Sequence, residues 1–277
     1  MHKLLSGSLR IEEITIPISQ LPSSLHQTRL VQLSDLHYDG LRLSEAMLEE
    51  AIEASNALQP DLVMLTGDYV TDDPTPIDAL ADRLQRLQSR KGIFAVLGNH
   101  DLHYPQSRSE VTNALTRAGI QVLWNEIAYP LGQALPIAGL ADFWSREFNP
   151  APVFNQLDPA IPRIVLSHNP DSAERLQSWR ADLILSGHTH GGQIVVPYFG
   201  PFPSTYQRLR QYVPKSWRRW IPYMREDICK VVRHWEWAQG LHQVGSNWLY
   251  VNRGLGTYPP GRLFCPPELT VINLVSQ

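Results

Sequence analysis

Five short apolar runs in this sequence each end in a motif built from Asp, Asn and His. The runs, which are rich in Val, Ile and Leu, are residues 28–34, 61–66, 92–97, 163–167 and 182–186. The motifs that follow them, in order, are Asp35-x-His37, Gly67-Asp68, Gly98-Asn99-His100-Asp101, Ser167-His168-Asn169 and Gly187-His188-Thr189-His190. Short continuous apolar runs are typical of strands buried on both faces, and open α/β sheets place their sites beyond the carboxyl ends of such strands. The pattern therefore predicts an α/β fold with one site built from five loops.

Helical patterns lie between the predicted strands in the first half of the chain. Residues 44–58 begin with Ser44, a typical N-cap residue, and carry apolar side chains at helical spacing. Residues 76–91 repeat that spacing. The second half favours strands, which we expect at residues 193–196, 247–252 and 268–275.

The residue types in the five motifs are those that bind divalent cations. Asp and Asn supply hard oxygen ligands, and His supplies a borderline nitrogen ligand. Such a mixed set without a thiolate suits Mn²⁺, Fe or Zn²⁺ and is a poor fit for Cu(I). One histidine alone would more often be a surface or core residue, but five motifs together favour a site for two divalent metal ions.

The order of the motifs resembles that of the calcineurin-like metallophosphoesterases, whose signature runs D-x-H, G-D, G-N-H-[DE], H and G-H-x-H. Within that superfamily, three segments are similar to the branch of bacterial YkuE-like and YaeI-like phosphohydrolases. These segments are residues 33–37, 187–193 and 252–257. The resemblance covers roughly residues 9–275 with one interruption. It implies a four-layer αββα sandwich, in which two mixed β-sheets are flanked by helices.

The resemblance also implies a role for each motif residue. The ligands implied for one metal ion are Asp35, His37 and His190. Those implied for the second ion are Asn99, His168 and His188. Asp68 would bridge both ions, because its two carboxylate oxygens can reach cations about 3.5–4 Å apart. His100 is not counted as a ligand: it would donate a hydrogen bond or a proton to the leaving oxygen, with Asp101 orienting its imidazole.

These roles imply a metal-dependent phosphoric ester hydrolase. A hydroxide shared by the two ions would attack phosphorus in line, since a bound metal lowers the pKa of water from about 15.7 to about 7. The bond cleaved would be a phosphomonoester, phosphodiester or pyrophosphate bond. The substrate would be a small-molecule phosphate ester or a lipid-linked compound, because the motifs bind the phosphoryl group and ignore what it is attached to.

Two alternatives to this general reading stay open. The first is a UDP-2,3-diacylglucosamine pyrophosphatase of lipid A synthesis, an activity found in a distant relative of this branch. Against it stands His100, since the classical form of that enzyme has arginine at this place. The second is a non-catalytic binding scaffold of the same fold, against which stands the presence of every ligand histidine in this chain.

Three further residues are weaker candidates for substrate binding. Asp142 follows a strand-like run and would lie behind a metal ligand or at the mouth of the site, or else cap a helix from a loop. Arg253 and Arg262 flank a stretch rich in Gly and Pro, whose turns can hold a guanidinium toward a substrate phosphate. Packing or surface ion pairs are the alternative for both arginines.

Composition sets the outer bounds. The 277 residues are 43% hydrophobic and 18% charged, which fits one globular domain over residues 1–277. The net charge of −3 gives no general attraction for nucleic acid, so local charge must draw a phosphate-bearing partner. Cys229 and Cys265 form no C-x-x-C pattern, and we find no signal peptide and no membrane-spanning run. We therefore expect a soluble cytoplasmic protein, or one attached to the surface of the inner membrane.

The segment of about residues 203–241 interrupts the resemblance and differs in composition from the rest. Residues 207–239 include eight Lys or Arg against three Asp or Glu, and five of the chain's eight Trp lie within residues 217–248. Pro214 and Pro222 predict two short helices with a break. Their apolar residues, which recur at helical spacing, are Trp217, Trp220, Ile221, Met224, Ile228, Val231, Val232 and Trp235.

This inserted segment, residues 203–241, has two interpretations. In the first, it is a cap whose apolar stripe packs on the domain. In the second, it is an interfacial helix pair that meets an anionic membrane through residues 207–239 or guides an amphiphilic substrate. Nucleic-acid binding is less favoured, because the aromatic residues fall on the apolar stripe and not along a stacking groove.

Overall fold

The computed structural model describes residues 6–218 and 231–277. Its main elements are two six-stranded sheets. The first sheet contains, in spatial order, β1 (Arg10–Ile18), β14 (Glu268–Ser276), β2 (Thr28–Leu33), β3 (Leu62–Leu65), β4 (Ile93–Ala95) and β5 (Ile120–Val122). The second contains β12 (Gly240–Val244), β13 (Asn247–Val251), β9 (Leu183–Ser186), β8 (Ile164–Leu166), β7 (Ile137–Gly139) and β6 (Glu126–Ala128). Both sheets are mixed, since β14 runs antiparallel to β2 and β13 antiparallel to β12.

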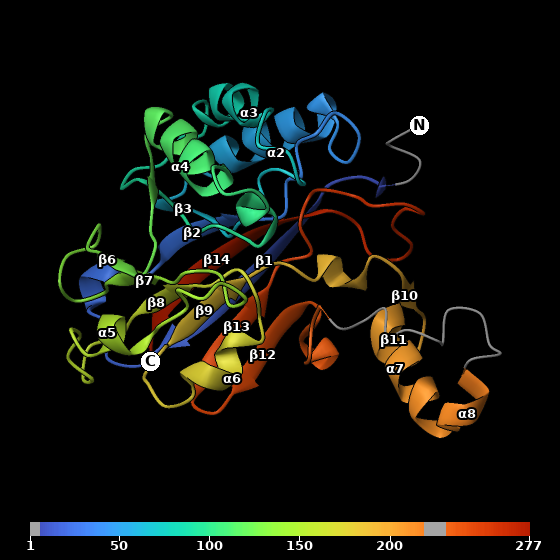
Figure 1. Ribbon diagram of the computed structural model, residues 1–277. Helices are drawn as coiled ribbons and strands as arrows, with labels where there is room; N and C mark the ends of the chain where they lie inside the picture. The colour runs from blue at the N-terminus through green and yellow to red at the C-terminus, as the bar shows by residue number, and fades with distance from the viewer. Residues whose placement is uncertain (1–5, 219–230) are drawn as a thin grey trace.

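The central strands of the first sheet are apolar on both faces because each face packs against a different layer. In β3, Leu62 and Met64 point into a cluster between the two sheets, whereas Val63 and Leu65 join a cluster on the outer face. This alternation follows from the period of two along a strand. The helices on the outer face are α2 (Glu45–Ala57), α3 (Ile77–Leu84) and α4 (Ser107–Arg117), which lie side by side over the sheet (Figure 1).

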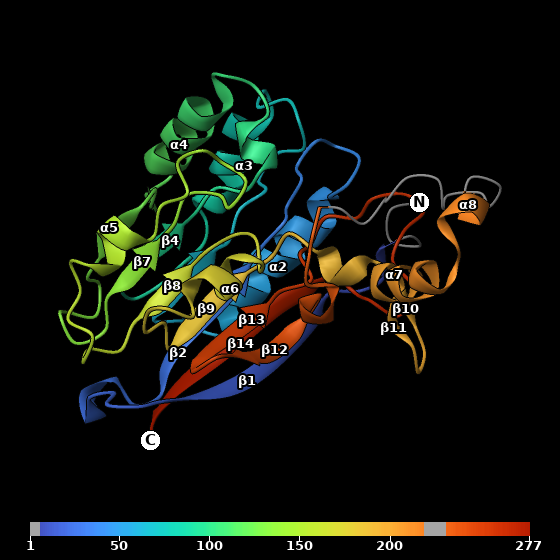
Figure 2. The ribbon, with the colours of Figure 1, turned by 60° about the horizontal axis from the view of Figure 1, so that its bottom comes forward.

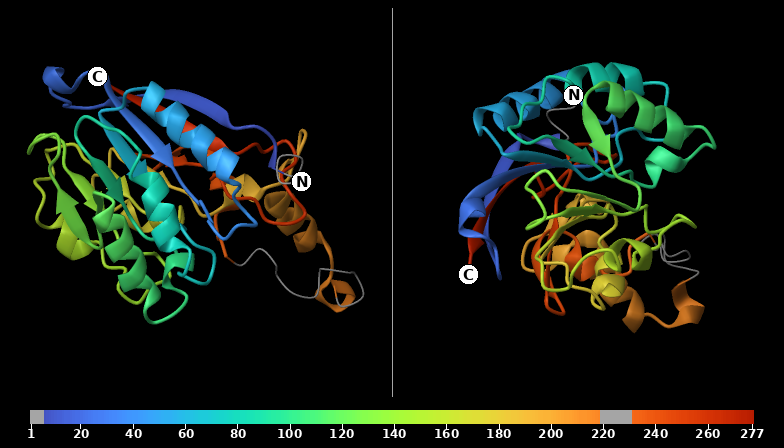
Figure 3. Two further views of the ribbon diagram at one scale, coloured as in Figure 1. Left: turned by 90° about the horizontal axis from the view of Figure 1, so that it is seen from above. Right: turned by 90° about the vertical axis from the view of Figure 1, so that its left-hand side faces the viewer.

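The second sheet repeats the arrangement on the other side. Leu166 and Leu185 point into the cluster between the sheets, and Val165 and Ile184 join a third cluster on the outer face. That cluster includes residues of α5 (Ala151–Phe154) and α6 (Ser172–Leu176). The molecule therefore has four layers, helices, sheet, sheet and helices (Figure 3). The predicted αββα sandwich is confirmed.

Most of the predicted elements are present. The five predicted strands are β2, β3, β4, β8 and β9, and Ser44 caps α2 by accepting a hydrogen bond from the backbone N–H of Met47 at 3.2 Å. The prediction of a helix over residues 76–91 was too long, because α3 ends at Leu84. The backbone N–H of Lys91 donates to the carbonyl of Asp61 at 2.8 Å, so the chain has already turned back toward β3 there.

Strand β1 was not predicted, although it is one of the two longest strands among the described residues. It lies at the edge of the first sheet and pairs in parallel with β14, with Arg10 opposite Glu268 and Ile18 opposite Ser276. Pro17 is compatible with this edge position, because an edge strand can lack one backbone donor. Figure 2 shows β1, β14 and β2 side by side, so both ends of the described chain belong to one sheet.

The inserted segment begins beside the ribbon of β10 (Val195–Val196) and β11 (Gly200–Pro201). It contains α7 (Phe202–Tyr212), α8 (Lys215–Arg218) and the 3-10 turn η4 (Trp235–Trp237). Pro214 lies in the break between α7 and α8, and both helices extend away from the sheets (Figure 1). Of the apolar stripe, Val232 and Trp235 are buried and Trp217 is 66% exposed. Pro222 and the stripe residues Trp220, Ile221, Met224 and Ile228 lie outside the described residues.

The apolar cluster between the sheets draws residues from both of them. We therefore propose that the chain forms one domain into which the inserted segment is built. Within residues 6–218 and 231–277, no helix combines the length and the apolar character needed to cross a bilayer.

Candidate metal centre

The five motifs meet where the carboxyl ends of strands from both sheets come together. Asp35 and His37 follow β2, Asp68 follows β3, and Asn99 follows β4. From the second sheet, His168 follows β8, and the last two histidines, His188 and His190, follow β9. The sheets face each other through an apolar cluster, so their strand-end loops form one polar group of side chains beside it.

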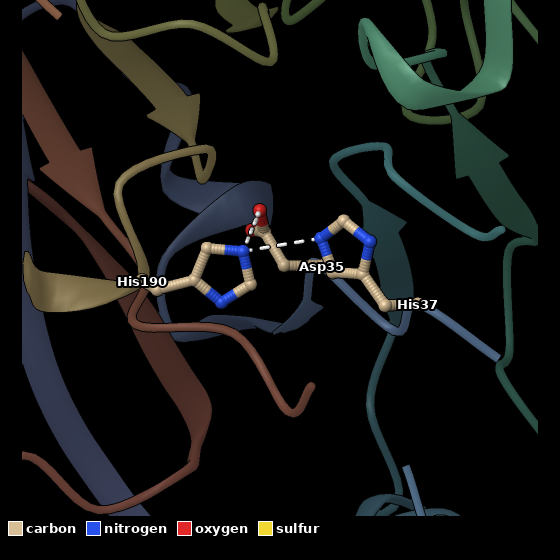
Figure 4. A group of neighbouring side chains, drawn as sticks. All are labelled: Asp35, His37 and His190. Atoms are coloured by element: carbon tan, nitrogen blue, oxygen red, sulfur yellow. Dashed lines mark hydrogen bonds and ion pairs between the residues drawn. The ribbon is translucent and has the colours of Figure 1, made fainter. Parts of the chain in front are cut away.

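The first group of potential ligands is Asp35, His37 and His190, whose ligand atoms all lie within 4.8 Å of one another. The Nε2 atoms of His37 and His190 are 3.1 Å apart, and Nε2 of His190 is 3.5 Å from Oδ1 of Asp35. Figure 4 shows the two imidazoles and the carboxylate turned toward one another. Asp35 and His37 are fully buried, and this arrangement can hold one divalent cation.

The second group is Asp68, His168 and His188. Oδ2 of Asp68 is 3.0 Å from Nε2 of His168, which in turn is 3.2 Å from Nδ1 of His188. The same Oδ2 atom is 3.7 Å from Nε2 of His37 in the first group. Asp68 is therefore the carboxylate that contacts both groups, which is the geometry expected of a bridging ligand.

Asn99 provides an independent test of whether a metal fits. Its Oδ1 atom is buried and has no hydrogen-bond partner among the described residues. A buried carbonyl oxygen without a partner costs about 1–3 kcal/mol of free energy, so it calls for an explanation. A cation beside this oxygen would supply the missing partner.

The four histidines each use one ring nitrogen for a contact away from the centre. The outer contacts are His37 Nδ1 to the Tyr258 hydroxyl (3.1 Å), His168 Nδ1 to the Thr66 carbonyl (2.7 Å), His188 Nε2 to the Val231 carbonyl (3.0 Å) and His190 Nδ1 to the Gly256 carbonyl (3.2 Å). A carbonyl can only accept, so it fixes the proton on the outer nitrogen. In the neutral rings of His188 and His190 the inner nitrogen then keeps its lone pair, as metal-ligating histidines require. The hydroxyl of Tyr258 can donate or accept, so it does not by itself fix the proton of His37.

The backbone at these residues is strained. Asp35, His37, Asp68, His188 and His190 all have positive φ values, between 44° and 70°. Residues other than glycine rarely adopt this left-handed conformation, and such strain is concentrated at functional sites. Gly187 is needed for a different reason: a Cβ atom there would lie 2.2 Å from Oδ2 of Asp35.

Burial and charge separate the protonation states of the histidines. Burial lowers the pKa of His37 to about 3 and of His188 to about 4, and it holds the pKa of His190 well below its usual value. These rings are therefore neutral at pH 7. Burial would also lower the pKa of His168, but the adjacent Asp68 carboxylate outweighs it and raises that pKa to about 10.

His100 and Asp101 have contacts that differ from those expected. The carboxylate of Asp101 accepts backbone N–H groups of Asp68, Tyr69 and Gly98 at 2.8–2.9 Å, so it ties together the loops after β3 and β4. The imidazole of His100 instead has its Nδ1 atom beside the Thr71 carbonyl and 3.5 Å from Oδ1 of Asp72. A ring nitrogen of His100 also lies within 4.8 Å of ligand atoms of His37 and Asp68.

The three weaker candidates occupy different surroundings. Asp142 is buried and lines a cavity of about 450 Å³ together with Asn99. Within residues 6–218 and 231–277, its Oδ1 atom has no hydrogen-bond partner. Arg253 forms ion pairs with Glu12 and Glu268, both at 2.8 Å. Arg262 donates to backbone carbonyls, including that of Gly256 at 2.6 Å. The contacts of both arginines match the packing alternative.

A larger pocket of about 900 Å³ adjoins the cavity that contains Asn99 and Asp142. The two share Trp144 and Ser145. The larger pocket is also lined by Phe143, Phe148, Trp179, Arg175 and Arg233. Its volume is in the range of small-molecule sites, and its aromatic walls suit an apolar or planar group.

Two side chains at the centre were missed by the sequence analysis. Asp72 lies beside His100. Tyr258 contacts His37 through its hydroxyl, and its ring meets the His190 ring edge to face, with the centroids 5.3 Å apart. Asp72 follows Gly67-Asp68 in the same loop, so its position gave a usable signal. Tyr258 is far from the other motifs in the chain, and only the fold brings it to them.

A four-layer α/β sandwich with two carboxylate–histidine groups at its strand ends defines a metallophosphoesterase. A family model described as calcineurin-like phosphoesterase matches residues 28–192, and the chain belongs to this family of hydrolases. The family assignment predicted from the motifs is confirmed. Phosphoester hydrolysis is thus the class of reaction, and divalent metals are the cofactors of the family.

Three relatives cover most of the chain. Phosphodiesterase YaeI of Escherichia coli (strain K12) is 32% identical over 89% of this chain and 82% of its own. UDP-2,3-diacylglucosamine pyrophosphatase LpxG of Chlamydia trachomatis serovar D is 28% identical over 97% of this chain and 90% of its own. The metallophosphoesterase YkuE of Bacillus subtilis (strain 168) is 31% identical over 95% and 85%.

Metal binding should release a proton from His168. With a pKa of about 10 in the metal-free protein, this imidazole is protonated at pH 7, whereas a metal ion needs the neutral ring. The affinity for metal should therefore rise about tenfold per pH unit between pH 7 and 8.5, because the proton competes less well as pH increases. Calorimetric titration with Mn²⁺ in two buffers of different ionisation enthalpy measures the proton release. An affinity that does not change with pH would contradict the His168–Asp68 pairing.

Proposed function

We propose that this protein hydrolyses a phosphodiester or pyrophosphate bond with two divalent metal ions held by the strand-end motifs. The observation that carries the proposal is the position of Asp68, whose Oδ2 atom lies 3.0 Å from His168 and 3.7 Å from His37. One carboxylate oxygen between two histidine groups supports a shared pair of cations. The residues of the first ion would be Asp35, His37, Asp68 and His190. Those of the second would be Asp68, Asn99, His168 and His188.

When bound, the two ions would supply a water of lowered pKa and positive charge beside the phosphoryl oxygens. The residues of the chain divide the remaining work. Carbonyl contacts hold His168, His188 and His190 in the metal-binding tautomer, and Asp101 holds the backbone of the Asp68 loop. His100, with Nδ1 fixed by Thr71 and Asp72, would donate a hydrogen bond or proton to the leaving oxygen.

The roles of Asp68 and His100 can be separated by mutation. Asp68→Asn should lower the metal content and abolish hydrolysis, because it removes the charge that both ions share. His100→Asn should keep two ions and reduce kcat by roughly 10²–10⁴, the range for a lost general acid. Elemental analysis of the purified variants decides the matter. Two retained ions in Asp68→Asn would refute the bridge, and metal loss in His100→Asn would make His100 a ligand.

The larger pocket, which has aromatic walls, supports a substrate with an organic group beside the reacting phosphate. It shares Trp144 with the cavity at Asn99, and Trp144 is 46% exposed, so this indole can pack against a bound group. Arg175, Arg233 and Glu174 line it, so its walls carry a net positive charge. A second candidate function is that of a UDP-2,3-diacylglucosamine pyrophosphatase. The volume and charge of the larger pocket and the similarity of the chain to LpxG favour it. Hydrolysis of that nucleotide-sugar lipid by the purified enzyme would select this candidate.

Trp144→Ala should impair substrates with a large aromatic group more than small ones. Bis(4-nitrophenyl) phosphate and methyl 4-nitrophenyl phosphate share a leaving group and differ in the group that is retained. The variant should lower kcat/KM for the first roughly 2- to 10-fold relative to the second, since aromatic pairs contribute about 0.5–1.5 kcal/mol. Tyr129→Ala, at an exposed tyrosine that lines neither cavity, is the control. Equal losses for both substrates would exclude a role for the pocket.

The scaffold alternative is distinguished by metal content. A binding scaffold would be purified without two tightly bound ions, whereas the proposed enzyme should take up two. The metals are proposed to be Mn²⁺, Fe or Zn²⁺, which suit oxygen and nitrogen ligands. A cytoplasmic location is part of the proposal, since Cys265 is a free and buried thiol, and cell fractionation tests it.

The inserted segment also supports a peripheral contact with anionic membrane. Large apolar side chains on and beside α7 and α8 are exposed, which are Tyr198, Phe199, Phe202, Leu209, Tyr212 and Trp217. Basic residues lie between them, such as Arg208 and Lys215. Aromatic side chains beside basic ones are typical of surfaces that enter the headgroup region of a bilayer.

The wild-type protein should therefore sediment with anionic liposomes at low salt. Each basic residue near the surface contributes about 1 kcal/mol, and salt weakens this attraction. Tyr212→Ala combined with Trp217→Ala should reduce sedimentation without changing the hydrolysis of a small soluble phosphodiester. Leu41→Ala, which removes an exposed leucine distant in sequence from this segment, is the control. No sedimentation of the wild-type protein at any salt concentration would refute the membrane contact.

A further inference from the structure

The end of the inserted segment contacts the loop that carries two potential metal ligands. We call residues 231–238 the return segment. The carbonyl of Val231 is 3.0 Å from Nε2 of His188, and the carbonyl of Ala238 accepts a hydrogen bond from the hydroxyl of Thr189 at 2.6 Å. The return segment thus holds two successive residues of the β9 loop.

A buried carboxylate fixes the return segment to the second sheet. Asp171 is completely buried at the start of α6, and its two oxygens accept the backbone N–H groups of Arg233 at 2.7 Å and His234 at 3.0 Å. The backbone N–H of Asp171 donates to the side chain of Asn169, the residue after His168. The anchor of the return segment therefore belongs to the same loop as the other histidine of the second group.

Apolar packing adds to this anchoring. Val232, Trp235 and Ala238 are buried and form a small cluster with Tyr206 of α7. The cluster joins the two described ends of the inserted segment. The docked position of the return segment is consequently set by both buried hydrogen bonds and apolar contacts.

The Val231 carbonyl determines which nitrogen of His188 can bind metal. A carbonyl fixes the proton on Nε2 and leaves the lone pair on Nδ1, the atom that lies 3.2 Å from Nε2 of His168. The outer contacts of His37, His168 and His190 come from Tyr258, Thr66 and Gly256, none of which belongs to the inserted segment. Displacement of the return segment would therefore remove the outer partner of His188 and leave the outer partners of the other three histidines in place.

We infer that the return segment, anchored by Asp171, positions His188 for the second metal ion, so that retention of this ion depends on the docked return segment. The inference rests on the proposed two-metal function. Asp171 is a positioning residue in this scheme, since it acts on His188 through the backbone of the return segment. The coupling is reciprocal: a metal ion at Asp68, His168 and His188 stabilises the docked return segment.

Arg233 offers a matched pair of variants for the test. Arg233→Pro removes the backbone N–H that Asp171 accepts, and Arg233→Ala keeps it while removing the same side chain. Loss of an outer partner typically weakens metal binding about 10- to 100-fold. Arg233→Pro should therefore bind one ion as tightly as the wild-type protein and the other about 10- to 100-fold more weakly, whereas Arg233→Ala should bind both normally. Titration with Mn²⁺, followed by elemental analysis after dialysis, measures both.

Asp171→Asn keeps the shape of the anchor and replaces one accepting oxygen, so it should give a smaller loss at the same ion. Glu110→Gln, at an exposed carboxylate of α4, is its control. Hydrogen exchange at the His234 amide supplies a readout independent of activity: Mn²⁺ should slow it in the wild-type protein and not in Arg233→Pro.

Tight binding of two Mn²⁺ ions by both Arg233→Pro and Asp171→Asn would overturn the inference and leave the proposed function intact. If Arg233→Pro fails to fold, Asp171→Asn and the exchange of the wild-type His234 amide decide alone. Failure of the proposed function itself would appear differently, as fewer than two ions in the wild-type protein.

Discussion

Carboxylates and imidazoles are buried together at the ends of five strands, and this burial has a large free-energy cost. Asp35, His37, Asp68 and His168 are each at most 1% exposed. An unpaired charge in such surroundings costs several kcal/mol, so these side chains must be paired, neutral or bound to a cation. The outer contacts of the histidines, and the glycines packed against Asp35, hold these side chains together in spite of that cost.

The strained backbone of the potential ligand residues adds a second free-energy cost to that of burial. Five potential ligands are left-handed, each at a cost of roughly 1–3 kcal/mol. The apolar clusters on both faces of each sheet supply the stabilisation that keeps them there. Strained loops at the ends of rigid strands place their side chains precisely, which a binding site for two cations requires.

The sequence predicted the buried strands and the motif residues because both depend on local patterns, whereas the four layers were implied by the family resemblance. Apolar runs such as residues 61–66 mark buried strands, and each polar motif follows directly from its strand. Contacts between distant parts of the chain were not predictable in this way. Asp101 was expected beside the His100 imidazole, but it accepts three backbone N–H groups of neighbouring loops, a task that depends on the three-dimensional path of the backbone. Tyr258 and Val231 reach the histidines only through the fold.

The position of β14 bears on the order in which the chain can fold during synthesis. This strand lies between β1 and β2, with Ile272 opposite Leu30 on one side and Ile14 on the other. Neighbouring strands of the first sheet therefore come from opposite ends of the described chain. Gly254, which lies directly against the side chain of Asp35, is also late in the sequence. On the ribosome, residues 28–192 would emerge before Gly254 and β14, so the Asp35 loop would still lack Gly254. The apolar edge of β2 in the nascent chain would stay exposed until β14 was made.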